Sequence, residues 1–218
     1  MAKIKSLGTL LAIASAFGST KAISAVTNAT SCVATLEAAH GVIVGDIVEI
    51  LTCTWGNLER RVARVSAVST NDVTLEGIDT SDTTKFPAGT ITGTLREIST
   101  WTAIDNRTRD FSASGGDLSF DDVSTLDDPE DRELPGSRSP VGHTFPGYFD
   151  PGKAWVSTVR TASDRSDTPV PVRESYVSGA KLYASAYWSF RETPTPEGNT
   201  LRDEIALRFA AKPAVYSS

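Results

Sequence analysis

Hydrophobic and polar residues alternate most regularly near the C-terminus. In residues 180–190 and again in 200–210, every second side chain is mainly apolar. A period of two is that of a β-strand, because successive side chains point to opposite faces. The connection TPTPEGN is too rich in proline to form a helix or a strand. The pattern predicts a long antiparallel hairpin with these residues on its inner faces: Leu182, Ala184, Ala186, Trp188 and Phe190 in one strand, and Leu201, Asp203, Ile205, Leu207 and Phe209 in the other.

Shorter strands are expected between residues 31 and 98. This region contains the segments SCVATL, DIVEILT, RRVARVSAV, DVTLEG and GTITGTLREI, which are rich in Val, Ile, Thr and Leu. Turn residues such as His40-Gly41 and Asn71-Asp72 separate them. Many short strands with turn signals between them are typical of a β-sandwich or barrel.

One helix is expected after residue 150. Asp150 can accept backbone N–H bonds as the N-cap, and Pro151 suits the first helical position. The helical spacing then places four apolar side chains on one face: Trp155, Val156, Val159 and Ala162.

The opening segment has two interpretations. Lys3 and Lys5 precede an apolar run from Leu7 to Phe17, which is the pattern of a secretory signal peptide. However, Gly8 and Thr9 dilute the run, and its alternation also suits a strand. We expect a first strand followed by a turn at Gly18-Ser19, and we keep export as the alternative.

A long acidic segment interrupts the regular pattern between residues 117 and 140. It begins as a strand and is expected to continue as a polar loop, and loops of this length are usually functional or disordered. It has carboxylates, but it lacks the spacing and the glycine of a calcium loop. We expect it to be mobile in the monomer and to become ordered against another protein. The candidate interface residues are Asp121, Asp122, Leu126, Asp127, Asp128, Glu130, Asp131, Arg132, Glu133 and Leu134.

Composition excludes several classes of function. The 218 residues carry a formal net charge of −6 and no cluster of Lys and Arg with aromatics, so a nucleic-acid-binding surface is not expected. No apolar stretch reaches the ~18 residues of a membrane span. His40 and His143, assigned to a turn and to a loop, have no partners at metal-ligand or catalytic spacing. We expect no enzyme activity, no metal and no cofactor, and we interpret Cys32 and Cys53 as reduced, small buried residues.

Several segments, taken in order, resemble the major tail tube proteins of long-tailed, non-contractile (siphovirus-type) bacteriophages. They are GTLLAIASAFGSTKAISAVTNAT, AAHGVIVGDIVEI, RRVARVSAVSTNDVTLEGIDTSDTTKFPAGT, WTAI at 101–104, FDDVSTLDDPEDRELPG, the helical region near Trp155, and AYWSFRETP with its partner strand. Together they extend over nearly the whole chain.

The resemblance implies a mainly β fold, with a sandwich or barrel core, one flanking helix and a small inserted β subdomain. Residues 1–25 and 99–218 would form the core, and residues 26–98 the insert. It also implies a structural virion protein, made in the infected bacterial cytoplasm, that forms rings, usually hexamers, which stack into a tube for genome ejection.

The partners that follow are further copies of the chain and other tail proteins: the tape measure, the tail terminator and the distal tail protein. Double-stranded DNA would pass through the lumen without specific binding, and acidic chains suit this because they do not retain phosphates. The acidic segment would lie at contacts between rings.

Other classes remain open at this point. A secreted β-sandwich binding or adhesion module is the main alternative, and it would require a cleaved leader. A capsid-decoration protein and a hydrolase are weaker alternatives.

Overall fold

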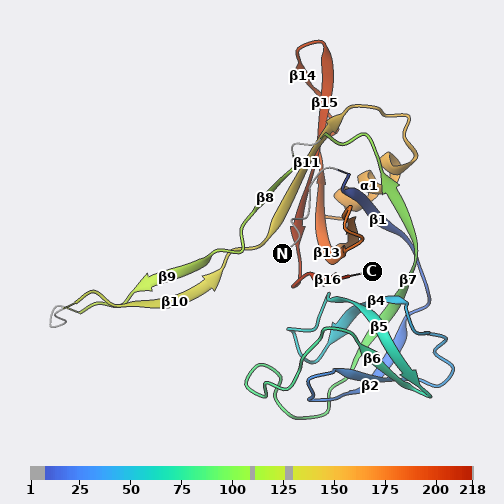
Figure 1. Ribbon diagram of the computed structural model, residues 1–218, viewed down its shortest axis with the longest axis vertical. Coiled ribbons are helices and arrows are strands. Elements are labelled where there is room, and N and C mark those ends of the chain that lie inside the picture. Colours follow the sequence, from blue (N-terminus) through green and yellow to red (C-terminus); the bar gives the residue numbers. More distant parts are fainter. Residues whose placement is uncertain (1–7, 109–110, 126–129, 218) are drawn as a thin grey trace.

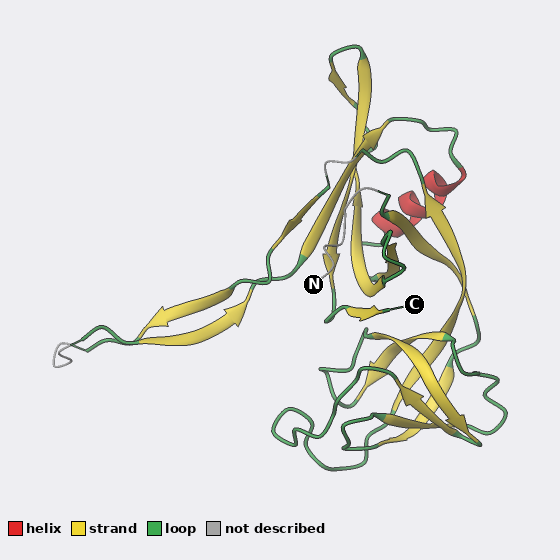
Figure 2. Ribbon diagram, viewed as in Figure 1, coloured by secondary structure: helices red, strands yellow, loops and turns green. Residues whose placement is uncertain are grey.

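The chain folds into two stacked β structures from which one hairpin projects sideways (Figures 1 and 2). The structure is a computed structural model that describes residues 8–108, 111–125 and 130–217. Its described part contains sixteen strands and one helix, so the predicted mainly β fold with one helix is confirmed. The strands are β1 (Leu10–Phe17), β2 (Lys21–Val26), β3 (Val33–Leu36), β4 (Ile47–Cys53), β5 (Val62–Ser69), β6 (Asp72–Leu75), β7 (Gly93–Ile104), β8 (Ser112–Ser114), β9 (Leu118–Asp122), β10 (Glu133–Arg138), β11 (Gly142–Tyr148), β12 (Val170–Ser175), β13 (Lys181–Phe190), β14 (Thr195–Glu197), β15 (Thr200–Phe209) and β16 (Ala214–Tyr216).

The first structure is a closed barrel. Its strands follow the order β2-β3-β6-β5-β4-β7, and β7 pairs again with β2, so no edge is left open. The strands predicted within residues 31–98 all belong to it. Its interior is a hydrophobic cluster that runs in sequence from Ile23 to Leu95.

The second structure is a curved sheet in the order β7-β1-β12-β13-β15-β11-β8. Strand β7 is long enough to serve both structures, with Gly93–Glu97 in the barrel and Ile98–Ile104 against β1. The opening segment is a strand within the sheet, as predicted, and Ile13 in β1 is fully buried. A second hydrophobic cluster lies on one face of this sheet. The division into a core (1–25 and 99–218) and an insert (26–98) remains a prediction.

Polar contacts join the two structures. The buried Glu49 of β4 accepts hydrogen bonds from Ser185 of β13 (2.8 Å) and from Arg96 of β7 (2.7 Å). The Tyr216 hydroxyl of β16 donates to the carbonyl of Glu76 in the barrel (3.0 Å). Because the barrel covers this part of the sheet, the outward-facing Tyr183 and Ser185 are buried too, which the alternation alone did not indicate.

The predicted helix is α1 (Ala154–Asp164), and its start differs from the prediction. Its buried residues are the four expected, Trp155, Val156, Val159 and Ala162. The N-cap is Lys153, not Asp150. The Asp150 carboxylate instead accepts the N–H of Gly152 (3.1 Å), which closes a turn at Pro151-Gly152 before the helix begins. The helix packs on β13, β1 and β7.

The C-terminal hairpin is confirmed, with Trp188 opposite Leu207 and Phe190 opposite Ile205. The connection was predicted wrongly, since Thr195–Glu197 forms β14 and pairs with the start of β15. Pro196 is tolerated there because, within the described residues, β14 is an edge strand whose outer side needs no N–H donor.

Both cysteines are free, and they differ in burial. Cys32 is buried, and burial raises the pKa of its thiol to about 11. Cys53, at the end of β4, is half-buried, and burial also raises its pKa. We expect iodoacetamide to label both thiols in denatured, non-reduced protein, and to label Cys53 faster than Cys32 in folded protein. Failure of both to react after denaturation would indicate a disulfide.

Candidate assembly interface

A two-stranded hairpin extends away from the body of the molecule (Figure 1). Among the described residues, its strands β9 and β10 pair only with each other. We call residues 117–138 the arm. The sequence predicted a loop after the first strand, and the second strand corrects that prediction. Pro135 and Gly136 disfavoured a strand, but Pro135 is acceptable in a ribbon whose outer edges are unpaired.

The structure places most of the candidate interface residues along this arm. The positions of these residues do not show whether they contact another chain, so their role at an interface remains a prediction. Asp121 and Asp122 lie in β9, Glu133 and Leu134 lie in β10, and Glu130, Asp131 and Arg132 lie toward the far end, whereas Leu126, Asp127 and Asp128 fall outside the described residues.

The arm carries the whole net charge of the protein. Of the 27 Asp and Glu residues in the chain, eight lie in residues 117–138, and of the 21 Lys and Arg residues, two do. This leaves 19 residues of each sign in the rest of the chain and a net charge of −6 on the arm. The body is therefore neutral, and the acidity that the sequence suggested for the whole surface is concentrated on one projection.

The arm has little to stabilise it by itself. Asp122 lies directly opposite Glu133, and like charges in this position are unfavourable. Hydrogen bonds from Ser124 hold the pKa of Asp122 below its ordinary value, so this carboxylate stays charged. Phe120 and Leu134 are 59% and 58% exposed. Since an isolated two-stranded hairpin is marginal in water, the arm would gain stability from a partner that supplies cations and apolar surface.

Two glycines form the elbow between β8 and the arm. Gly115 and Gly116 have φ values of +81° and +86°, a region that side chains other than glycine rarely adopt. A Cβ on Gly115 would lie 2.8 Å from the carbonyl carbon of Pro140. The Gly116 N–H bonds to the carbonyl of Ser139 (3.0 Å), which holds the two sides of the arm together at its base. The consecutive glycines were the sequence signal for this elbow.

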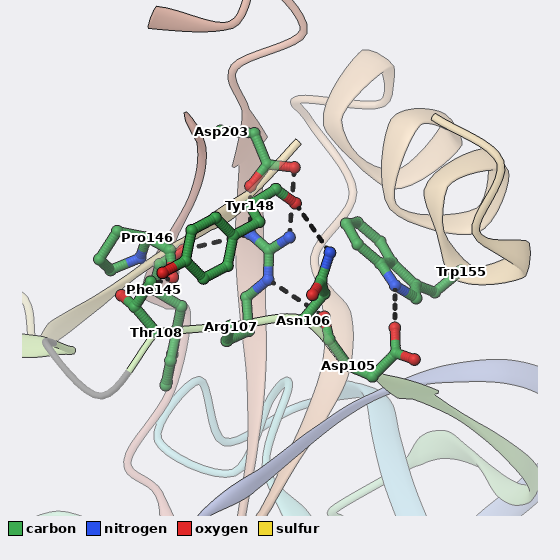
Figure 3. A network of polar contacts seen from close by, with 9 residues as sticks. All are labelled: Asp105, Asn106, Arg107, Thr108, Phe145, Pro146, Tyr148, Trp155 and Asp203. Carbon is green, nitrogen blue, oxygen red and sulfur yellow. Dashed lines mark hydrogen bonds and ion pairs between the residues drawn. The ribbon is translucent and has the colours of Figure 1, made fainter. Parts of the chain in front are cut away.

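A buried ion pair joins the segment before β8 to β15, at the end of β11 that lies away from the arm (Figure 3). Arg107, just before β8, makes a bidentate pair with Asp203 of β15 at 2.6 and 3.2 Å, and both side chains are at least nine-tenths buried. The guanidinium also lies 4.7 Å from the ring centre of Trp155 in α1. Bidentate pairs of this kind fix geometry as well as adding energy. Arg107 thus connects the segment that enters the arm with the sheet and the helix.

Further hydrogen bonds join residues 106–108 to β11, the strand that follows the arm. Asn106 and Tyr148 exchange hydrogen bonds, from the Tyr148 N–H to the Asn106 backbone carbonyl and from the Asn106 side-chain amide to the Tyr148 carbonyl, both 3.1 Å. The Thr108 N–H donates to the carbonyl of Pro146 (2.8 Å). Residues 106–108 therefore run alongside β11 (Figure 3). The segment before β8 is therefore tied to the strand that follows the arm.

Gly147 leaves the space that the Arg107 guanidinium occupies. A Cβ at this position would lie 2.6 Å from both terminal guanidinium nitrogens. We expect Gly147→Ala to destabilise the protein by about 1–3 kcal/mol, the usual cost of overpacking, as measured by urea unfolding. Gly89→Ala is the control, because a Cβ there meets nothing within 4 Å. Equal stability of the two variants would contradict this packing.

The two histidines have structural environments. His143 lies in β11, not in the predicted loop, and its Nδ1 bonds to the buried Glu174 carboxylate (2.7 Å), which also accepts from Tyr176 (2.9 Å). His40 spans its turn by bonding to Thr70 and Val42, both at 3.0 Å. Within the described residues, no group of three His, Cys, Asp or Glu side chains is arranged to hold a metal ion. None of the described helices is long and apolar enough to cross a membrane.

The family comparison identifies the fold that carries this arm. The model of the phage tail tube protein (TTP) family matches residues 53–218, which is well over half of the chain. The chain belongs to this family. It is a structural protein of a phage tail, and the match includes the arm, its elbow and the Arg107 anchor. Membership in this family supports a structural tail protein over the secreted adhesion module, the alternative that the sequence alone left open. No curated protein matched the sequence.

Two solved structures have weak similarity to the chain. One is the tube-terminating cap of the anti-feeding prophage, with 18% identity, a TM-score of 0.34, and coverage of 49% of this chain and 79% of the cap. The other is the sheath/tube terminator of the PVC extracellular contractile injection system in its extended state. It has 18% identity, a TM-score of 0.35, and coverage of 49% and 84%. TM-scores below 0.5 do not establish a shared fold, so the assignment rests on the family match.

Proposed function

We propose that this tail tube protein assembles with copies of itself into rings, and that its arm joins each ring to the next. The stacked rings, hexamers by the sequence resemblance, form the tube of a long-tailed, non-contractile phage, and DNA leaves the capsid through it. The observation that carries this proposal is the arm: a solvent-exposed ribbon with both charged and apolar side chains, whose strands pair only with each other among the described residues.

Several properties of the arm support an assembly role. Its exposed Phe120 and Leu134 gain free energy when a partner removes them from water. Single exposed ion pairs contribute only ~0–1 kcal/mol, but a closed ring repeats each contact in every subunit. The hydrogen bond between Gly116 and Ser139 already holds the two sides of the arm together at its base, which lowers the cost of ordering it when it docks.

The charge distribution supports passage of DNA without binding. A protein that grips DNA presents surplus Lys and Arg to the phosphates. Here the body is neutral, and several of its guanidinium groups are paired with carboxylates, as in Arg160–Glu192 and Arg191–Glu204. A tube built from such bodies would not retard the genome electrostatically.

The remaining roles follow from the family. A tail tube protein acts without catalysis, and its partners in the virion would be the tape measure, the tail terminator and the distal tail protein. It would be made in the infected bacterial cytoplasm before it is built into the tail.

Sedimentation velocity over a range of concentrations tests self-assembly. The 23.2 kDa chain should shift to species of ring size and larger as its concentration rises. Persistence of the monomer at the highest soluble concentration would contradict the proposal.

A further inference from the structure

The body of the protein has a hollow at the base of the arm whose chemistry complements the arm itself. It has a volume of about 710 Å³ and lies on the outward face of the sheet. We call it the Tyr187 hollow. Its main lining residues are Ser114, Pro140, Tyr187, Arg208 and Ala210, with Asp117 at the end nearest the arm.

Arg208 is a fixed and accessible cation in this hollow. It lies opposite Tyr187 across the β13–β15 pair. Its guanidinium extends over Gly142, where a Cβ would come within 2.8 Å of its Cδ, and it donates a 3.0 Å hydrogen bond to the Ser114 hydroxyl. No described carboxylate lies within ion-pair distance of it. A guanidinium held in this way loses little freedom when a carboxylate binds.

Tyr187 gives the hollow an apolar floor beside this charge. Its side chain is 41% exposed, whereas its neighbours Ala186 and Trp188 on the other face are buried. Arginine and tyrosine, well exposed and adjacent, are the residue types that most often dominate protein interfaces.

We propose that the Tyr187 hollow receives the arm of a second copy of this chain. Phe120 of the incoming arm packs on Tyr187, and Asp122, on the same face of β9, pairs with Arg208. This inference rests on the proposed function and adds the receiving surface to it. The second copy is the occupant because the charges are complementary. A net −6 on every arm prevents arms from pairing with one another, while the hollow offers an unpaired guanidinium.

The arm of the same chain cannot fill the hollow. Its base forms one rim of the hollow, through Gly115 and Ser139, and from there the arm points away from the body (Figure 1). Each copy therefore presents an arm on one side and an empty receptor at its base, an arrangement that propagates from copy to copy.

Charge reversal in the full-length protein tests the inference. We expect Arg208→Glu to raise the concentration needed for assembly about tenfold or more in sedimentation velocity, since each tenfold corresponds to about 1.4 kcal/mol. Lys181→Glu is the matched control, because it makes the same charge change at an exposed position on β13 outside the hollow. Adding Asp122→Arg to the Arg208→Glu chain should restore assembly.

The outcomes separate the two proposals. Wild-type assembly with an unaffected Arg208→Glu variant would overturn the docking site and leave the proposed function standing. Loss of assembly without rescue by the arm reversal would overturn the pairing of Arg208 with Asp122. A wild-type protein that stays monomeric would overturn both. If Arg208→Glu lowers the melting temperature, Tyr187→Ser replaces it, and normal assembly of that variant would overturn the docking site.

Discussion

Truncating Leu207 to alanine is expected to destabilise the protein by about 2–5 kcal/mol. Leu207 is fully buried, pairs across the sheet with Trp188, and belongs to the cluster that also contains helix α1. The truncation removes this contact area and leaves a cavity that the surrounding strands cannot close. Trp188→Ala should cost a similar amount, because it also leaves the Val170 carbonyl without the indole N–H that lies 2.9 Å away.

Leu201→Ala is the matched control for Leu207→Ala. It is the same substitution on the same strand, but Leu201 is 49% exposed, so a change within about 0.5 kcal/mol is expected. Urea unfolding of the three variants beside the wild type measures the difference. A loss at Leu207 below about half a kcal/mol, or equal to that at Leu201, would contradict the register of the β13–β15 pair.

Removing the arm should abolish tube formation and leave the fold intact. The suitable variant joins Asp117 to Arg138 through Asn-Gly, a two-residue turn that closes antiparallel strands. The junction is feasible because the Ser139 N–H already donates to the Asp117 carbonyl (2.9 Å) at the base of the arm. The excised segment has no buried residue in its described part, so the melting temperature should change by only a few degrees.

Electron microscopy beside thermal melting measures both effects. The shortened protein should melt cooperatively and should form no tubes at concentrations where the wild type does. Tubes of normal length from the shortened protein would refute the role of the arm. A narrower deletion of residues 126–134 should also leave a folded, soluble protein that forms no tubes, because it removes several of the candidate interface residues, Leu134 among them.

The regular strands were predictable because burial on one face imposes a period of two on the sequence. The alternation in 180–190 and 200–210 reproduces the β13–β15 pair, and the apolar spacing after residue 154 reproduces the buried face of α1. Burial that results from the packing of the barrel on the sheet was not predictable. Tyr183 and Ser185 look like solvent-facing residues until the barrel is placed over them.

The candidate site was predictable in composition but not in shape. Its acidic residues were evident in the sequence, yet Pro135 and Gly136 concealed β10. The anchor was missed because its partners, Arg107 and Asp203, lie 96 residues apart. One signal for it was present: Asp203 occupies an apolar row of the period-two pattern, and a buried carboxylate in such a row requires a paired cation.

A reconstruction of the wild-type tube by electron cryomicroscopy tests the central claim most directly. The account predicts stacked rings in which the arm of every subunit crosses the ring boundary and contacts the body of a subunit in the next ring. A tube whose rings stack through other surfaces, with the arms free in solvent, would contradict it.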